Sequence, residues 1–286
     1  MLGKLLKHEF RATGRIMLPA LGALILLAGL ANLSYRGIEY NAATAEGPFA
    51  VFVRLVLLFT IILFFLGLFA AVVMSVVLMV QRFYRNLMRD EGYLMFTLPV
   101  SVHGLVWSKL IVSFVWITLT GLIATALFLL TILNFASVGF AEFFGFWPEV
   151  MAELTENLRE LGITPAYLNG TLVFYICLMI VSTLSSCLHF YAAMAIGHSF
   201  AKDKVLLSIV FFIAISFGFQ ILSTALSIGL VPLLENYLEA IDFQGTGDAY
   251  RLFNSLWAYS GVLALLQGVI LYFLTVIPLK KGLNLA

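Results

Sequence analysis

The sequence predicts an all-α membrane protein with six transmembrane helices, and three observations support this fold class. Hydrophobic residues make up 62% of the 286-residue chain and charged residues only 11%, and the mean hydropathy is +1.06. This composition lies outside the range of soluble globular domains. Six apolar stretches have about the 20 residues that a helix needs to cross a bilayer. Basic and acidic residues also fall on opposite sides of these stretches, as they do in membrane proteins.

The six spans are predicted within one transmembrane domain that covers residues 1–286. We place them at 16–33, 55–80, 110–134, 171–197, 205–230 and 256–277. The first span is short, but its core is rich in leucine and alanine. A cleavable signal peptide over residues 1–31 is the alternative, because basic residues precede an apolar run there. We favour a span, since the basic segment before the apolar run is long and has a partly helical pattern.

The distribution of charge predicts that both termini are cytoplasmic. One side of the predicted spans carries 12 of the 16 basic residues, and the other side carries 11 of the 15 acidic residues. Cytoplasmic loops retain lysine and arginine, so the basic side is the inner one. The net charge of +1 hides this separation, and no basic patch independent of the membrane remains. The sequence therefore predicts no nucleic-acid partner.

Residues 1–15 are predicted to form a cytoplasmic interfacial helix before the first span. Several leucines and Phe10 lie near one helical face, and Lys4, Lys7 and Arg11 lie on the other. This arrangement suits a helix that lies in the membrane interface. A solvated basic tail is the alternative interpretation.

The segment between the second and third spans is the longest charged and patterned segment between two apolar runs. Arg82, Arg85 and Arg89 stand three and four residues apart, so their side chains share one helical face and mark a cytoplasmic boundary. The second helix is therefore expected to continue about two turns beyond the bilayer. Asp90 and Glu91 then suit the start of a new, short helix outside the bilayer, where unpaired backbone N–H groups favour acidic residues.

The short helix is expected to end before the third span begins. Pro99 disfavours the helical conformation for the residue before it, and Ser101 is a good N-cap for the next helix. We refer to residues 90–101 as the connector. It is predicted to lie at the cytoplasmic face.

An amphipathic outer helix is predicted over residues 148–161, between the third and fourth spans. Pro148 can occupy the first helical turn, and Gly162 can end the helix. One face is apolar, with Val150, Leu154, Leu158 and Leu161. Two interpretations remain open, a helix packed on the membrane surface and a lid over a substrate exit.

Polar side chains that could line a path through the membrane concentrate in the fourth span. They are Ser182, Ser185, Ser186 and His189. Hydroxyl groups in spans more often join helices to one another than bind ligands. An ionisable group at membrane depth is a functional candidate, yet no acidic residue accompanies His189 in the span. We therefore favour a hydrogen-bonded, structural histidine and keep the path as the alternative.

The sequence lacks the motifs of several catalytic classes. It contains neither a Gly-x-x-x-x-Gly-Lys-Ser/Thr phosphate loop nor a His-Glu-x-x-His zinc motif. The six predicted spans contain no Asp, Glu, Lys or Arg, groups that ion-coupled carriers usually need. We therefore predict a protein that is not an enzyme, with no catalytic, cofactor or metal site of its own. Any energy it uses is expected to arrive through the cytoplasmic face.

The connector resembles the coupling region of ABC type-2 exporter permeases. The resemblance rests on the run DEGYLMFTLPVS from Asp90 to Ser101, followed by Lys109 at the start of a span. Members of that family have six spans, a cytoplasmic amphipathic N-terminal helix, and an acidic-Gly and Leu-Pro-x-Ser signature between spans two and three. The outer helix between spans three and four departs from the family pattern, which places its outer helices before the last span.

The resemblance implies a partner protein and a mechanism. The connector would dock into a groove on a separate ATP-binding cassette subunit, which would hold ATP and magnesium. Pairs of permeases, identical or different, would form an export path in the plasma (inner) membrane of a bacterium. The implied ATPase-coupling residues are Asp90, Glu91, Gly92, Tyr93, Leu94, Phe96, Leu98, Pro99 and Ser101.

Two other classes of protein remain as alternatives. A polytopic sensor or scaffold could hold a cytoplasmic partner through the same connector without transporting anything. An enzyme acting on lipid would need a convergent polar cluster, which His189 and the nearby hydroxyls do not supply. Apolar walls with scattered hydroxyls fit lipids, amphipathic peptides and drugs equally well, so the sequence does not identify a substrate.

Overall fold

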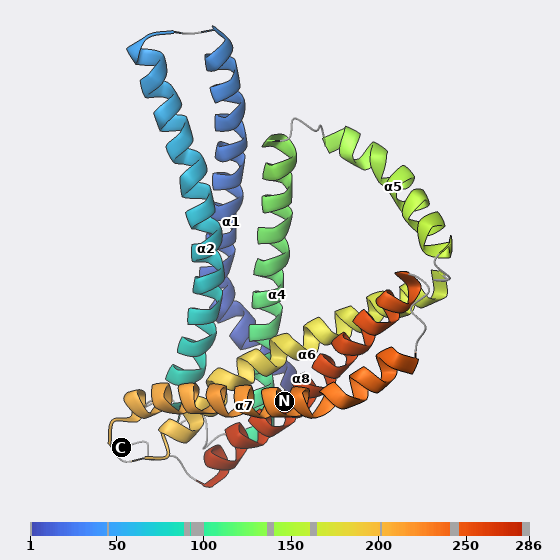
Figure 1. The fold of residues 1–286 in the computed structure, drawn as a ribbon. Coiled ribbons are helices and arrows are strands. Elements are labelled where there is room, and N and C mark those ends of the chain that lie inside the picture. Colours follow the sequence, from blue (N-terminus) through green and yellow to red (C-terminus); the bar gives the residue numbers. More distant parts are fainter. Residues whose placement is uncertain are drawn as a thin grey trace. The chain divides into compact units, whose positions relative to one another are not determined.

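The computed structural model describes residues 2–44, 46–88, 92, 100–135, 140–160, 165–200, 202–240 and 246–281. These residues form seven long helices and no strand, which confirms the predicted all-α class (Figure 1). The helices are α1 (Leu2–Thr44), α2 (Pro48–Met88), α4 (Val102–Phe135), α5 (Phe140–Glu160), α6 (Pro165–Gly197), α7 (Lys204–Ala240) and α8 (Thr246–Lys281).

Six of the described helices are long and apolar enough to cross a membrane. They are α1, α2, α4, α6, α7 and α8, and the best window of each has a mean hydropathy between 2.1 and 3.0. Each of the six contains one predicted span, in the predicted order. The chain is therefore a multi-pass membrane protein.

The helices are longer than the predicted spans. Helix α2 has 41 residues, about 61 Å at a rise of about 1.5 Å per residue, which is twice the thickness of a bilayer core. It contains Arg82 and Arg85 and ends at Met88, so the predicted helical extension past Val80 is confirmed.

Helix α1 differs from the prediction, because no break separates residues 1–15 from residues 16–33. The helix runs without interruption from Leu2 to Thr44. The residues predicted as a separate interfacial helix are its first turns. Pro19 lies inside the helix, where a proline removes one backbone hydrogen bond and bends the axis without having to end it. Figure 1 shows the darkest blue, N-terminal part of α1 inclined to the rest.

One further boundary was wrong, since helix α5 begins at Phe140 and not at Pro148, which lies inside it. The apolar part of α7 that could cross a membrane ends at Leu230, as predicted, and the helix itself continues through Pro232 to Ala240. Leu161 and Gly162, at the predicted end of the outer helix, lie outside the described residues.

The chain divides into two compact units. The first contains residues 1–79 and 111–150, and the second contains residues 80–110 and 151–286. Both α2 and α4 therefore contribute to each unit. The end of α2 and the start of α4, which flank the connector, belong to the second unit together with α6, α7 and α8.

The first unit has a core of small and large apolar side chains. Leu24, Ala28 and Ala31 of α1 pack with Ile61 and Phe64 of α2, and all five are buried. Small residues at such contacts let helices approach closely, as is common in membrane bundles.

Polar contacts also tie α1 to α4 in the first unit. The Trp116 indole donates a hydrogen bond of 2.8 Å to the Thr13 hydroxyl, and the amide of Asn32 bonds the Thr131 hydroxyl at 3.2 Å.

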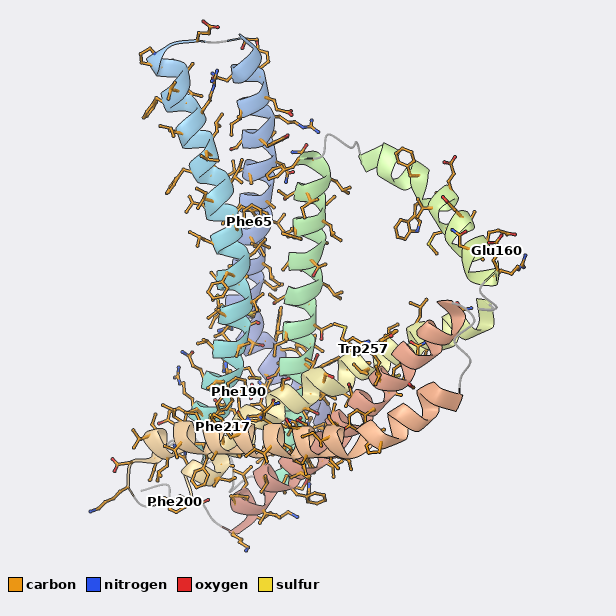
Figure 2. The ribbon with its side chains drawn as sticks, viewed as in Figure 1. Phe65, Glu160, Phe190, Phe200, Phe217 and Trp257 are labelled. Carbon is orange, nitrogen blue, oxygen red and sulfur yellow. The ribbon has the colours of Figure 1, made fainter. Side chains whose placement is uncertain are left out.

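In the second unit α6 packs against both α7 and α8. A Cβ atom on Gly268 of α8 would lie 2.6 Å from the Ser185 hydroxyl of α6, so a larger residue here would force that hydroxyl to rotate. The outward faces of the spans carry large apolar side chains, such as Phe217 of α7, which is 64% exposed (Figure 2). Such surfaces suit contact with lipid or with a second membrane protein.

Candidate functional site

The last turns of α2 lead into the connector and are anchored in the core of the second unit. Phe83 and Leu87 are fully buried. The ring of Phe83 stacks on the ring of Tyr191 from α6, with centroids 4.0 Å apart and planes inclined by only 10°. Tyr191 is also fully buried. An aromatic pair of this kind adds to the stabilisation from burial alone, so the entry to the connector is held firmly on α6.

Gly92 is the one residue between 89 and 99 that the structure describes, and it packs against the end of α2. A Cβ atom on this residue would lie 2.6 Å from the carbonyl oxygen of Leu87. A backbone atom cannot rotate away as the end of a side chain can. The position therefore requires a glycine, which agrees with its place in the acidic-Gly signature.

The first turn of α4 forms the return from the connector. The Ser101 hydroxyl accepts a hydrogen bond of 3.2 Å from the backbone N–H of Gly104, which confirms Ser101 as the N-cap. In the same turn Nδ1 of His103 lies 2.6 Å from the hydroxyl of Tyr272 on α8, and in the next turn the Trp107 ring also contacts Tyr272. The return from the connector is thus held on α8.

The other predicted coupling residues lie outside the described residues. They are Asp90, Glu91, Tyr93, Leu94, Phe96, Leu98 and Pro99. Their predicted roles therefore remain predictions from the sequence.

Two of the four candidate path residues of α6, Ser185 and His189, make contacts that hold helices together. The Ser185 hydroxyl donates to the carbonyl of Ala264 on α8 at 2.9 Å. Nε2 of His189 lies 2.9 Å from the Ser216 hydroxyl, which itself donates to the carbonyl of Phe212 on α7. Both bonds support the structural interpretation of these residues.

Ser182 and Ser186 lie on a more open face of α6. The Ser186 hydroxyl donates to the carbonyl of Ser182 one turn earlier, at 2.9 Å, and Ser186 is exposed. None of the four path candidates is among the residues that line the cavity described next.

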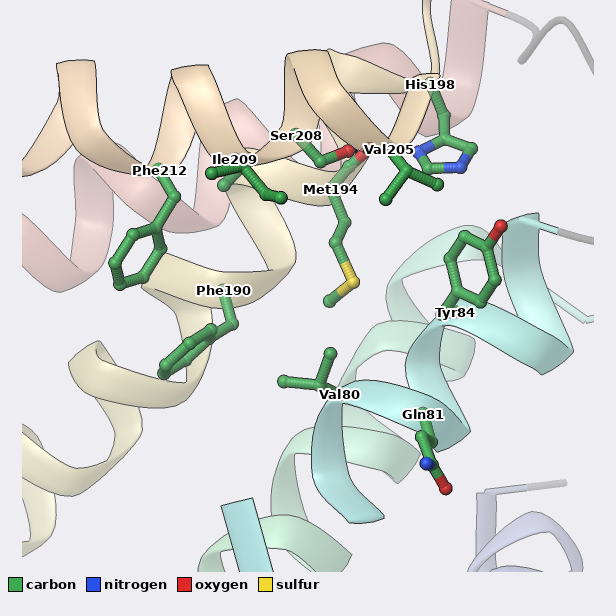
Figure 3. Close-up of a pocket in the computed structure, with 11 residues that line it drawn as sticks. Val80, Gln81, Tyr84, Phe190, Met194, His198, Val205, Ser208, Ile209 and Phe212 are labelled. Carbon is green, nitrogen blue, oxygen red and sulfur yellow. Dashed lines mark hydrogen bonds between the residues drawn. The ribbon is translucent and has the colours of Figure 1, made fainter. Parts of the chain in front are cut away.

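A cavity of about 510 Å³ lies beside the end of α2, between it and the α6–α7 hairpin (Figure 3). Phe190 and Phe212 form one end, whereas Tyr84 and His198 lie at the other. The remaining lining residues are Val80, Gln81, Ala193, Met194, Val205, Ser208 and Ile209. The volume is typical of sites that bind small molecules, and most of the lining is apolar.

His198 organises the polar end of the cavity. Its ring packs edge-on against Tyr84 at 5.2 Å, and its Nδ1 donates to the carbonyl of Met194 at 3.0 Å. The Ser208 hydroxyl lies 3.3 Å from the same nitrogen. Burial lowers the pKa of His198, the hydrogen bond to Met194 opposes this, and the charge of Lys204 lowers the pKa further. His198 is therefore neutral at pH 7.

Little in the sequence indicates this cluster. His198 follows the fourth span directly, in a turn of a few residues, where a histidine reads as an ordinary surface residue. Gly197 is the residue in the sequence that could have indicated the cluster. A Cβ atom there would lie 2.5 Å from the backbone nitrogen of Ser208, so the glycine marks a close approach of two helices.

The described residues include no group of three or more His, Cys, Asp or Glu side chains that could hold a metal ion. What they contain is a buried anchor before the connector, a part-buried anchor after it, and an apolar cavity beside the end of α2. Comparisons of the chain with protein-family models, with curated proteins and with solved structures returned no match.

Proposed function

We propose that this chain is the transmembrane subunit of an ABC exporter. Two such subunits, identical or different, form the translocation path in the plasma membrane of a bacterium, with both termini in the cytoplasm. Separate ATP-binding cassette subunits bind the connector and supply ATP and magnesium. The chain itself hydrolyses nothing.

The observation that carries this proposal is the anchoring of both flanks of the connector within one compact unit. Phe83 fixes the entry to α6, and His103 fixes the return to α8. A connector held only by lipid-facing helix ends would yield when a partner pulled it. Since packed interiors transmit displacement, these two contacts suit a segment through which a partner moves α6 and α8.

The proposed mechanism is mechanical. ATP binding brings the two ATPases together and displaces the connectors that they hold. The sequence suggests that the stiff second span carries this displacement, and the continuity of α2 through Met88 supports that role. The anchors add a second route, because a shift of the connector also reaches α6 through Phe83 and α8 through His103.

Each connector residue has a proposed role in this coupling. Asp90 and Glu91 start the short helix and make polar contacts with the ATPase. Apolar insertion into the ATPase groove comes from Tyr93, Leu94 and Phe96. Gly92 allows the close approach to the end of α2, and Leu98, Pro99 and Ser101 return the chain to the membrane.

The test is a pair of double variants. The full-length chain is co-expressed with the ATP-binding cassette protein that we expect to be encoded beside it, and co-purification of the two is measured. Tyr93→Ala with Phe96→Ala should reduce recovery of the ATPase without reducing the amount of chain in the membrane. Tyr40→Ala with Phe146→Ala is the matched control, because it removes the same two side chain types at exposed positions outside the connector.

Equal recovery of the ATPase with both double variants would refute the proposal. A second outcome would favour the sensor or scaffold class instead. In it, recovery of the ATPase falls with the connector variant, but the rate of ATP hydrolysis is the same with and without the chain.

A further inference from the structure

The proposed ATPase coupling does not explain the cavity next to α2. Its apolar end, at Phe190 and Phe212, suits a hydrocarbon, whereas its polar end contains Tyr84 and His198. A ligand that matches both ends is amphipathic, with a hydrocarbon chain and a polar head (Figure 3).

The apolar wall of the cavity opens toward the outer face of α7. Val205 and Ile209 both line the cavity, and each is 56% exposed. Between and beyond them on α7, Leu206, Val210 and Ile213 are exposed apolar side chains of the kind that contact lipid. A hydrocarbon chain can therefore enter the cavity sideways from the surrounding bilayer.

Basic residues stand next in the sequence to residues that line the cavity. Arg82 and Arg85 each directly follow a residue of α2 that lines it, and Lys202 and Lys204 lie in the sequence just before the lining residue at the start of α7. The described acidic residue in these segments is Asp203, which is exposed. We call the four cations the basic rim. Their charge complements an anionic head group such as a phosphate, and basic pockets between spans at the cytoplasmic side are suited to anionic lipids.

We infer that this cavity holds one acyl chain of an anionic phospholipid from the cytoplasmic leaflet, with the lipid phosphate at the basic rim. The bound lipid joins the end of α2 to the α6–α7 hairpin and so braces the entry to the connector. A second copy of this chain is a poorer occupant, since a symmetric contact over the cavity would bring two basic rims together. The inference rests on the proposed orientation, with both termini in the cytoplasm, and not on the proposed transport function.

The first test measures lipid binding by the purified full-length chain. Native mass spectrometry compares retention of phosphatidylglycerol and phosphatidylcholine with identical acyl chains. Arg85→Gln with Lys202→Gln should weaken phosphatidylglycerol binding by roughly tenfold. Lys280→Gln with Lys281→Gln removes the same charge from exposed residues in the last turn of α8 and should leave binding unchanged.

The second test fills the cavity. Ile209→Trp should reduce retention of both lipids, because the larger side chain occupies the space of the acyl chain. Since Ile209 is more than half exposed, the fold should tolerate this change, and a circular dichroism spectrum identical to that of the parent protein checks that it does.

Three results would overturn the inference. The first is equal retention of the two lipids by the parent protein. The second is an equal effect of the rim variant and the α8 control, which would indicate charge attraction at the surface in general. The third comes from a photo-crosslinking residue placed at Val205 in membranes, where adducts to a second copy in place of lipid would show that protein occupies the cavity.

Discussion

Replacing Gly197 by alanine should force the end of α6 away from the first turns of α7. A Cβ atom at this position would lie 2.5 Å from the backbone nitrogen and 2.7 Å from the Cα of Ser208. Unbonded heavy atoms rest at about 3.5 Å from each other, so the methyl group would overlap the backbone of α7 by about 1 Å. Because a backbone cannot rotate away, the hairpin itself must open.

The energetic cost follows from this overlap. Inserting a methyl group into a closely packed site typically costs about 1–3 kcal/mol. Alanine is a better helix former than glycine by about 1 kcal/mol, but Gly197 is the last residue of α6, where this gain is small. We expect a net loss of about 1–2 kcal/mol. The hydrogen bond between His198 and Ser208 should be lost with it.

The assay is unfolding of the full-length protein in mixed micelles with an increasing fraction of sodium dodecyl sulfate. Gly218→Ala on α7 is the matched control, because a Cβ atom there meets no described atom within 4 Å. The two substitutions have the same effect on the unfolded chain. The difference between their midpoints therefore reports the overlap at Gly197 together with the gain in helix propensity of about 1 kcal/mol at Gly218, which lies inside α7. If Gly197→Ala unfolds at the same midpoint as Gly218→Ala, the close approach of the two helices is wrong.

Two further predictions concern the second unit. Burial, reinforced by the charge of Lys204, lowers the pKa of His198 in the folded protein below its ordinary value of 6.5. As the pH falls through 6.5, the unfolded state therefore binds more protons than the folded state. The free energy of unfolding should decrease by at most about 1.4 kcal/mol per pH unit. In the same unfolding assay at pH 7.5 and 5.5, His198→Gln should show a smaller decrease, and an unchanged decrease would contradict this origin. Tyr272→Phe should cost about 1 kcal/mol, because it removes the 2.6 Å hydrogen bond with His103 and keeps the ring. Tyr259→Phe, which loses only an exposed contact of 3.4 Å, is its control, and equal midpoints for the two would contradict the anchor.

Local signals in the sequence predicted much of the fold. Long apolar stretches identified all six spans, because a bilayer imposes a length and a composition on each helix. The N-cap at Ser101 follows from the identity of one residue and its neighbours. The helical extension of α2 through Arg85 follows from the spacing of its arginines. Hydrogen bonds between helices at Ser185 and His189 match the general behaviour of polar groups in spans.

Helix boundaries near prolines were predicted less well. Pro148 was taken as the start of a helix and Pro19 as part of a short first span, yet both lie inside longer helices. Proline costs one backbone hydrogen bond, and the turns on either side can carry the helix past it. The sequence alone does not show whether those turns are stable enough to do so.

Partners that are distant in the sequence could not be predicted. Phe83 and Tyr191 are separated by 108 residues, and no pattern in either segment predicts that they come into contact. The cavity could not be predicted for the same reason, since its walls come from three helices that meet only after packing. Its polar end depends on His198, a residue whose burial the sequence does not indicate.

The division of α2 and α4 between two units has a consequence for how the protein is made. Phe83 and His103 leave the ribosome well before Tyr191 and Tyr272, the residues that hold them. During this interval the flanks of the connector have no permanent support, and they acquire it only when the last helix has been inserted. If the proposed function holds, the ATPase would therefore meet a fully supported connector only on a completed chain, and nascent or truncated copies would be poor competitors for it.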